Sequence, residues 1–253
     1  MTECVMAPTG VRPGFAIIDY MSDEVEALAP LGVIFRDVLR SMHASEPQLG
    51  ADGHRHEIDD TTRISIEEGM TLFTLCVTHQ VTSTLEVGLA YGFSTGYLLA
   101  ALERTGGGTH VAIDPYQATD WSGIGLTTAR RLVAGTDALT AESFTLVAER
   151  SDPALIDLER AGRTFGLTFI DGYHRFDDVL VDFTLAARMC PVGGMIVLHD
   201  MWLDSIAAVA SFLRRNRLDF AEIATGCDNL FALRRVDQDR RDWSHFVAFE
   251  LRQ

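Results

Sequence analysis

The chain has 253 residues, 47% of them hydrophobic, which suits one packed α/β domain with a modest extension. Its formal net charge of −15 would repel phosphate backbones, so nucleic acid is not an expected partner. All 21 basic residues are arginines, which excludes a lysine Schiff base, a Walker-type phosphate lysine and a lysine general base.

The N-terminal segment and the cysteines indicate a soluble, cytoplasmic protein. The first residues lack the basic and apolar regions of a secretory signal, and no apolar run approaches the ~20 residues that cross a membrane. Cys4, Cys76, Cys190 and Cys227 form no C-x-x-C pair, so we expect reduced thiols rather than disulfides or a zinc site. No membrane partner is expected.

Residues 1–63 are expected to form an N-terminal helical extension and a lid loop. Within them, residues 22–43 begin with a capping serine, Ser22, followed by acidic residues and an apolar stripe, which predicts a helix broken near Pro30. This helix is apolar on one side and lies outside the expected core fold. It is therefore a candidate dimer element, and we expect a homo-oligomer.

The segment 44–62 is polar and contains two glycines and a proline, which predicts a mobile loop. His54 and His56 lie in this loop without a nearby third ligand. We expect them to be solvated rather than to bind a metal.

Residues 64–253 are expected to form the main domain. A helical period over 64–80 is followed by short apolar, β-branched runs that alternate with helical segments. This alternation predicts a doubly wound, mostly parallel sheet. The last two runs are so close in sequence that they must pair antiparallel, so the seventh strand should run against the others. The expected strands are Thr84–Val87, His110–Ile113, Phe144–Ala148, Leu167–Ile170, Met195–Leu198 and two runs within 219–226 and 229–236.

Residues 92–96 read G-F-S-T-G, which matches the G-x-S-x-G pattern of a serine hydrolase. A nucleophile elbow places its serine directly at the end of a strand, whereas the strand before Ser94 ends near Val87. Ser94, Asp171 and His199 do follow the Ser, Asp, His order of α/β-hydrolases, but no oxyanion segment precedes the serine. A serine hydrolase using Ser94 is the alternative from a different enzyme class.

The turn after the first strand also fits a nicotinamide site poorly. Residues 88–92 give G-x-x-x-G rather than G-x-G-x-x-G, although Asp114 closes the second strand as a ribose-binding acid would. Glu86 lies inside the first strand, where an unpaired buried carboxylate is costly. We expect it to accept hydrogen bonds from loop amides or a cationic ligand, or to brace its own loop.

The sequence TLEVGLAYGFSTGYLLAAL, residues 84–102, resembles motif I of class I S-adenosylmethionine-dependent methyltransferases. The closest form is L-E-x-G-x-x-x-G-x-S, found in the catechol and caffeoyl-CoA O-methyltransferase branch and its bacterial natural-product relatives. The resemblance covers roughly residues 64–236. It implies a Rossmann-like methyltransferase fold, S-adenosylmethionine as the cofactor and a small-molecule methyl acceptor.

The resemblance also implies the cofactor contacts. Ser94 matches the serine that hydrogen-bonds the cofactor carboxylate, and the start of its helix would add a favourable dipole. Asp114 matches the acid that binds both ribose hydroxyls, and Arg150 and Ser151 fall beside the adenine, although VAERSD departs from the usual glycine-containing pattern there. The implied cofactor-binding residues are Glu86, Gly88, Tyr91, Gly92, Ser94, Asp114, Pro115, Arg150, Ser151, Asp171 and Tyr173.

The same comparison suggests a metal and a general base. Asp171 and Asp200 match two magnesium-binding aspartates, but Met201 replaces the asparagine that completes the site, which puts the metal in doubt. His174 stands where the family has a lysine base, and an ordinary histidine pKa near 6.5 suits proton removal. His199 is the other candidate base, a ligand for a softer divalent cation, or an uncharged buried histidine bonded to Asp171.

The acceptor is less well defined. Tyr116, Trp121 and Trp202 are expected to contact it, with residues 46–63 as a further wall, which favours a modest polar or aromatic molecule. We expect methyl transfer to a hydroxyl oxygen. An N-methyltransferase, or a nicotinamide-binding or non-catalytic relative, stays open.

Overall fold

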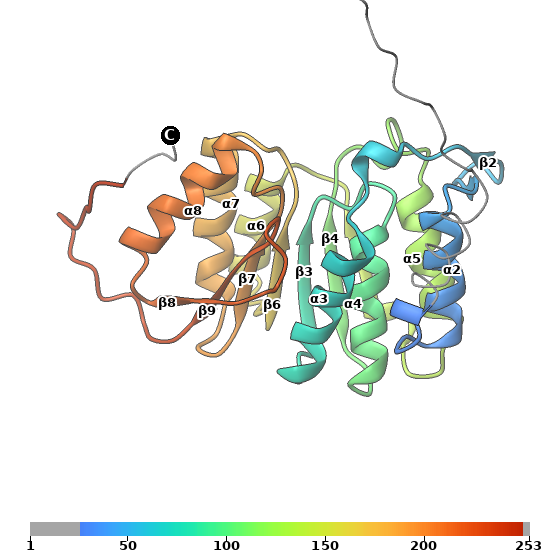
Figure 1. Ribbon diagram of the computed structural model, residues 1–253, viewed down its shortest axis with the longest axis horizontal. Coiled ribbons are helices and arrows are strands. Elements are labelled where there is room, and N and C mark those ends of the chain that lie inside the picture. Colours follow the sequence, from blue (N-terminus) through green and yellow to red (C-terminus); the bar gives the residue numbers. More distant parts are fainter. Residues whose placement is uncertain (1–25, 250–253) are drawn as a thin grey trace, which may run out of the picture.

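The computed structural model describes residues 26–249 and contains a seven-stranded sheet (Figure 1). The strand order is β5-β4-β3-β6-β7-β9-β8, with β9 antiparallel to both of its neighbours and the first five strands parallel. The predicted doubly wound sheet and its antiparallel last strand are therefore confirmed. The strands are β3 Ser83–Val87, β4 Thr109–Ile113, β5 Phe144–Val147, β6 Leu167–Ile170, β7 Met195–Leu198, β8 Phe220–Ile223 and β9 Phe231–Arg235.

Helices cover both faces of the sheet, and within residues 26–249 none is long and apolar enough to span a membrane. Figure 1 shows α3 and α4 near β3 and β4, and α7 and α8 near β7 to β9. The helices are α2 Val33–His43, α3 Ile66–Thr78, α4 Phe93–Arg104, α5 Ile124–Ala134, α6 Ser151–Arg160, α7 Phe176–Met189 and α8 Asp204–Asn216, with short turns η1 Asp60–Thr62 and η2 Ala141–Ser143.

Alternate residues of each strand point to opposite faces, as the pleat of a strand requires. In β6, Leu167 and Phe169 pack in the core that includes α3 and α4, whereas Ile170 packs in the core that includes α7 and α8. Both faces of the sheet are therefore buried, which accounts for the nearly continuous apolar runs of the parallel strands.

Helix α2 belongs to the main core, in contrast to the predicted role as an external dimer element. Phe35, Val38, Leu39 and Met42 are buried in the cluster that also contains residues of α4. The apolar stripe is thus covered within the chain, so it gives no reason to expect a partner subunit. A break near Pro30 is present, since a turn precedes the start of α2, and Ser22 lies outside the described residues.

The predicted loop over 44–62 contains a short antiparallel hairpin. Strand β1, Gln48–Leu49, pairs antiparallel with β2, Arg55–His56, and the amide of Ala51 donates to the carbonyl of Ser122. Short polar strands of this kind carry little hydrophobic signal, which explains why the sequence suggested a loop.

The position of α2 leads to a test of its role in stability. Phe35 is fully buried, so Phe35→Ala is expected to lower the free energy of unfolding by about 3–5 kcal/mol. Val33→Ala on the exposed side of the same helix, where 65% of Val33 is exposed, should change it by less than about 0.5 kcal/mol. Denaturant unfolding measures both values, and equal small effects would mean that α2 folds apart from the core.

Candidate functional site

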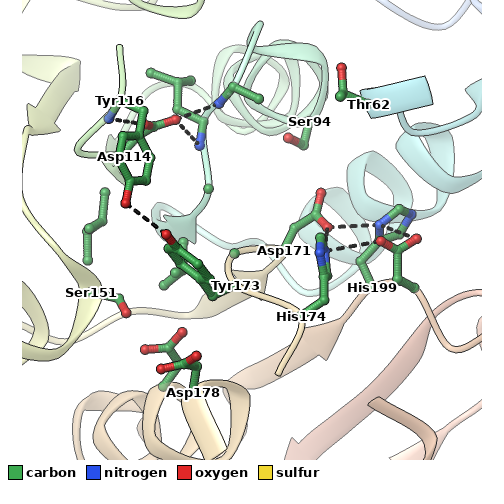
Figure 2. Close-up of a pocket in the computed structure, with 18 of the residues that line it drawn as sticks. Thr62, Ser94, Asp114, Tyr116, Ser151, Asp171, Tyr173, His174, Asp178 and His199 are labelled. Atoms are coloured by element: carbon green, nitrogen blue, oxygen red, sulfur yellow. Dashed lines mark hydrogen bonds and ion pairs between the residues drawn. The ribbon is translucent and has the colours of Figure 1, made fainter. Parts of the chain in front are cut away.

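A cavity of about 620 Å³ lies at the carboxyl ends of β3, β4, β6 and β7 (Figure 2). This is where an open α/β sheet binds its ligands. Residues 61–64, where the N-terminal segment meets the main domain, also line the cavity. Most predicted site residues line it, namely Gly88, Tyr91, Gly92, Ser94, Asp114, Pro115, Tyr116, Trp121, Arg150, Ser151, Asp171, Tyr173, His174, His199 and Asp200.

The turn between β3 and α4 is shaped by glycine. Gly88 has a φ of +96°, and a Cβ there would lie 2.3 Å from the carbonyl oxygen of Asp171. Only glycine permits this close approach of the two strand ends. Gly92 is also left-handed and caps α4, so that Ser94 lies in the first turn of the helix, where backbone amides have no partner within the helix. This helix end is suited to an anionic group.

The carboxylate of Asp114 holds that turn in place. Its Oδ2 accepts hydrogen bonds from the amides of Leu89 (3.2 Å) and Ala90 (2.8 Å) and from Gln117 Nε2 (3.1 Å). Its Oδ1 accepts from the amide of Tyr116 at 2.7 Å. A carboxylate has about four lone-pair positions, so Oδ1 retains capacity for one further donor.

Ser94 has no catalytic histidine beside it. Among the hydrogen bonds of residues 26–249, none joins the Ser94 hydroxyl to a histidine, and His199 is instead bonded to Asp171. A hydrolase triad needs the serine and the imidazole in contact. The Ser, Asp, His order in the sequence therefore does not form a triad in this fold.

Glu86 is fully buried and does not line the cavity, contrary to what its place in the turn suggested. Thr95 Oγ1 donates to its Oε2, and His110 Nε2 lies 3.3 Å from the same atom. Its other oxygen, Oε1, has no hydrogen-bond partner among the described residues. Glu86 thus joins β3 to α4 and β4 from within the protein, and no loop amide among the described residues donates a hydrogen bond to it.

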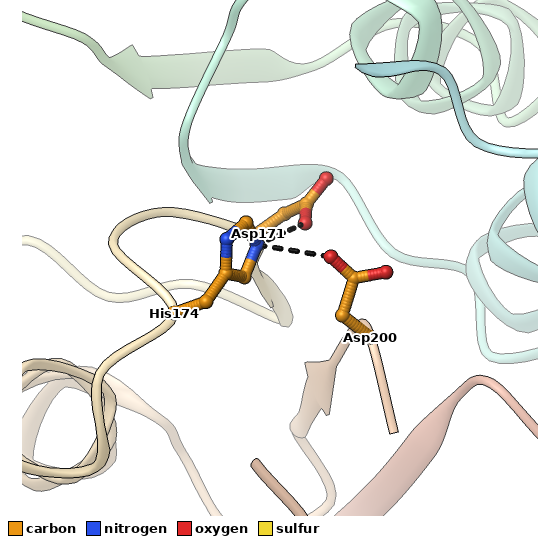
Figure 3. A group of neighbouring side chains, drawn as sticks. All are labelled: Asp171, His174 and Asp200. Carbon is orange, nitrogen blue, oxygen red and sulfur yellow. Dashed lines mark hydrogen bonds and ion pairs between the residues drawn. The ribbon is translucent and has the colours of Figure 1, made fainter. Parts of the chain in front are cut away.

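The strongest electrostatic feature is a cluster of histidines and carboxylates at the ends of β6 and β7. His174 Nε2 lies 3.4 Å from Asp171 Oδ1 and 3.1 Å from Asp200 Oδ2, and it points between the two carboxylates (Figure 3). His199 Nδ1 lies 2.9 Å from Asp171 Oδ1, and its Nε2 lies 3.4 Å from Glu68 Oε1. Two imidazole rings are thereby set among three acids.

These carboxylates raise the pKa of both histidines. Hydrogen bonds to Asp171 and then Asp200 raise the pKa of His174 to about 9. Burial alone would lower the pKa of His199, but the charge and hydrogen bond of Asp171 outweigh it and raise the value to about 10. Both shifts favour the protonated rings at neutral pH, in contrast to the ordinary pKa expected for His174 and to the uncharged form considered for His199.

The residues around Asp200 show one further difference from the sequence prediction. Asp200 has a φ of +58°, an uncommon backbone conformation that is enriched at functional positions. Met201 packs against the core beside α7 and α8. Trp202 is 73% exposed and outside the cavity lining, where its Nε1 donates to Asp200 Oδ1 at 2.9 Å. Trp202 therefore contacts a site residue from outside the cavity, rather than forming its wall.

Aromatic side chains line much of the cavity. The hydroxyls of Tyr116 and Tyr173 are 2.9 Å apart, and the rings of Tyr91 and Trp121 meet edge to face at 5.1 Å. Phe93 also lines the cavity. These surfaces suit flat or partly apolar ligands.

Several site residues were not found from the sequence. Glu68 and Asn229 bond to each other at 2.8 Å and reach His199 from distant parts of the chain, with no local motif to reveal them. Asp182 also lines the cavity. It is an acidic residue on the otherwise apolar face of α7, and this break in the pattern could have been recognised in the sequence.

The raised histidine pKa values predict how stability depends on pH. In the unfolded chain both histidines have a pKa near 6.5, so the protonated rings stabilise the folded state fully below pH 6.5. This stabilisation is lost as the pH rises through the folded-state pKa values of about 9 for His174 and about 10 for His199. We expect thermal stability in EDTA to fall between pH 6.5 and about 10, and to fall less in His199→Gln. His54→Gln, at an exposed histidine, is the matched control. An unchanged slope in His199→Gln would contradict this assignment.

Comparisons with known proteins agree with this geometry. A family model described as a methyltransferase domain matches residues 85–201, which include the β3–α4 turn, Asp114, Asp171 and Asp200. No curated protein sequence is significantly similar to the chain.

Solved structures share the fold at low sequence identity. An O-methyltransferase from Bacillus cereus in complex with SAH has 17% identity and a TM-score of 0.60, with 88% of this chain and 97% of that chain covered. The O-methyltransferase TomG from Streptomyces achromogenes, involved in tomaymycin synthesis and in complex with SAM, has 20% identity and a TM-score of 0.60, with 86% and 96% covered. The SAH-bound methyltransferase PaMTH1 from Podospora anserina has 11% identity and a TM-score of 0.62, with 91% and 100% covered. Residues 85–201 therefore match a methyltransferase domain, and the chain has the Rossmann-like fold of S-adenosylmethionine-dependent methyltransferases.

Proposed function

We propose that this enzyme transfers a methyl group from S-adenosylmethionine to a hydroxyl oxygen of a small molecule. The observation that carries the proposal is the group formed by Asp171, His174 and Asp200 on the cavity wall, whose ligand-type atoms lie within 4.8 Å of one another. A neutral hydroxyl is a weak nucleophile, so its proton must be removed or its charge stabilised as it reacts. A group of this kind beside the acceptor serves that need.

The cavity fits the cofactor at three positions. The start of α4 with Ser94 suits the carboxylate of the methionine part, and the free position on Asp114 Oδ1 suits one ribose hydroxyl. Tyr173 and Ser151 border the space left for the adenine. When bound, the cofactor supplies a methyl carbon on a positively charged sulfur. The residues of the chain hold this carbon in line with the acceptor oxygen and exclude water, which is where most of the acceleration would arise.

A divalent cation fits between Asp171, His174 and Asp200. The separations of 3.1 and 3.4 Å from His174 Nε2 are near the ~3 Å expected between neighbouring ligands around a metal with ~2.1 Å bonds. His174 would supply the third ligand that Met201 cannot, and a mixed nitrogen and oxygen set suits manganese, iron or zinc better than magnesium. When bound, the cation would lower the pKa of the acceptor hydroxyl.

The proton on Nε2 of His174 would compete with that cation, because both interact with Asp171 and Asp200. The imidazolium satisfies Asp171 and Asp200 in the absence of a metal, so metal binding requires the loss of its proton. Without a metal, the same ring acts as the general base once it is deprotonated. His199, held by Asp171 and Glu68, would fix the orientation of Asp171 in either case.

The acceptor space lies between the acid–histidine cluster and the aromatic wall. Ile64, Tyr91, Phe93 and Trp121 give it an apolar surface, and Thr62 adds a hydroxyl. In the view of Figure 2, Thr62 and the two histidines lie at the end of the cavity opposite Ser151. This composition favours a small molecule with an aromatic or partly apolar body and a hydroxyl.

The cofactor assignment is tested by calorimetry with S-adenosylmethionine. The wild-type protein should bind it with a micromolar Kd, and Asp114→Asn should weaken binding by about 10- to 100-fold, because it removes a charged acceptor and disturbs the amides of the turn. Asp120→Asn, an exposed acid in the same loop, should bind as the wild type does. Absence of binding by the wild type would contradict the proposed function.

The role of His174 is tested by turnover with methyl-labelled cofactor and a panel of small phenols, catechols and alcohols. His174→Ala should lower kcat by about 10²- to 10⁴-fold while cofactor binding is retained. His54→Ala should leave turnover unchanged, since His54 lies outside the cavity. If a metal takes part, EDTA should abolish wild-type turnover and manganese should restore it.

Wild-type turnover by His174→Ala would overturn its assignment. Transfer to amines but not to any hydroxyl of the panel would instead identify an N-methyltransferase with the same cofactor site.

A further inference from the structure

Glu68 is a buried acid of α3 that contacts the acid–histidine cluster without lining the cavity. Only 8% of the residue is exposed, and it borders neither the cofactor space nor the acceptor space. Its Oε2 accepts a hydrogen bond from the amide of Ser65 at 2.6 Å, which completes the capping box at the start of α3. A capping box requires only one carboxylate oxygen, so the position of the other oxygen needs a separate explanation.

The other oxygen, Oε1, faces His199. It lies 3.4 Å from Nε2 of that ring and accepts a hydrogen bond from Asn229 Nδ2 at 2.8 Å. Burial would raise the pKa of Glu68, but hydrogen bonds from His199, the Ser65 amide and Asn229 outweigh it and lower the value to about 2. Glu68 is therefore an anion at neutral pH. It connects α3 with the residue after β7 and with the loop between β8 and β9.

His199 in turn lies between the two carboxylates that follow β6 and β7. Its Nδ1 is 2.9 Å from Asp171 Oδ1 and 3.3 Å from Asp200 Oδ1. Neighbouring carboxylates repel each other, and a shared donor relieves that repulsion. Nδ1 can be this donor in only one orientation of the ring, because a half-turn about the bond to Cβ would place a carbon atom there instead.

Glu68 distinguishes between these two orientations. In the orientation present, Nε2 meets a charged acceptor on the side of the ring away from the two aspartates. After a half-turn, the carboxylate of Glu68 would face a ring carbon and would lose this interaction. Hydrogen bonds to charged groups are among the stronger ones in proteins, so Glu68 favours the orientation that directs Nδ1 to the aspartates.

We propose that Glu68 is a positioning residue for methyl transfer, because it holds Nδ1 of His199 toward the two carboxylates. Asp171 and Asp200 would thereby keep their places around His174 on the cavity wall (Figure 3). Glu68 itself takes no part in the chemical step. This inference rests on the proposed function, since it concerns the same acid–histidine cluster.

The first test follows the His199 ring by NMR of the protein labelled with isotopic histidine, at neutral pH and without any ligand. The signal of its Nδ1–H is identified by its absence from His199→Gln. The wild type should show this proton protected from exchange with water. Glu68→Gln should lose the protected signal, because the single oxygen of glutamine cannot serve both the Ser65 amide and the ring. An unchanged signal in a folded Glu68→Gln protein would overturn the proposal.

The second test measures turnover with methyl-labelled cofactor and the hydroxyl acceptors of the panel above. Glu68→Gln should lower kcat by about 10- to 100-fold, the range typical of residues that orient a site from behind its directly acting groups. The KM for S-adenosylmethionine should be unchanged, because Glu68 does not border the cofactor space. Wild-type kcat in this variant, or a loss confined to the KM, would contradict the assignment.

Two control variants separate positioning from the stability of α3. Ser65→Ala removes the hydroxyl that accepts from the Glu68 amide at 3.2 Å but keeps the carboxylate, so it should lower the melting temperature and leave the NMR signal and kcat as in the wild type. Glu67→Gln removes the same charge from an exposed neighbour and should change neither readout.

The controls also distinguish the possible failures. Equal losses of signal and turnover in Ser65→Ala and Glu68→Gln would mean that Glu68 acts only through the helix, which would overturn the proposal. Failure of the wild type to bind S-adenosylhomocysteine, or to methylate any hydroxyl of the panel, would instead reject the proposed function. The NMR comparison requires neither ligand, so it tests the orientation of the His199 ring independently of that function.

Discussion

Negative charge at the carboxyl edge of the sheet is the constraint on which the site depends. Parallel strands end at one edge, so Asp114, Asp171 and Asp200 meet around a single cavity in a chain of net charge −15 that contains no lysine. Each carboxylate must find donors or cations at close range. Asp114 finds the amides of the neighbouring turn, while Asp171 and Asp200 find two imidazolium rings.

These different solutions divide the cavity into regions with different chemistry. The negative charge of Asp114 is balanced by hydrogen bonds from backbone amides of the fold, and one hydrogen-bonding position of the carboxylate is left for a neutral hydroxyl. The negative charges of Asp171 and Asp200 are balanced by protons on His174 and His199, and these protons can be released. In the proposed function, a metal ion could replace such a proton, or the histidine that has lost its proton could accept one from the methyl acceptor. The proposed function assigns methyl transfer to the end where the charge can change, and recognition of the cofactor to the end where the charge is fixed.

The sequence predicted those features that follow from local pattern. The five parallel strands, the antiparallel end of the sheet and the acids that end β4, β6 and β7 could be read from periodicity and from motif I. The raised pKa of His174 could not, because it depends on Asp171 together with Asp200, which follows a different strand. Glu68 and Asn229 reach His199 from remote segments for the same reason. The hairpin over Gln48–His56 was missed because its strands are short and polar, and α2 was placed outside the core because its apolar stripe does not reveal what covers it.

The account is tested most directly by the crystal structure of the complex with S-adenosylhomocysteine. It predicts the homocysteine carboxylate at the start of α4 near Ser94, one ribose hydroxyl on Asp114 Oδ1, and the purine beside Tyr173 and Ser151. The sulfur should then face the space beside Asp171, His174 and Asp200. A ligand bound in the reverse direction, or outside this cavity, would contradict the assignment of the cofactor site and the chemistry derived from it.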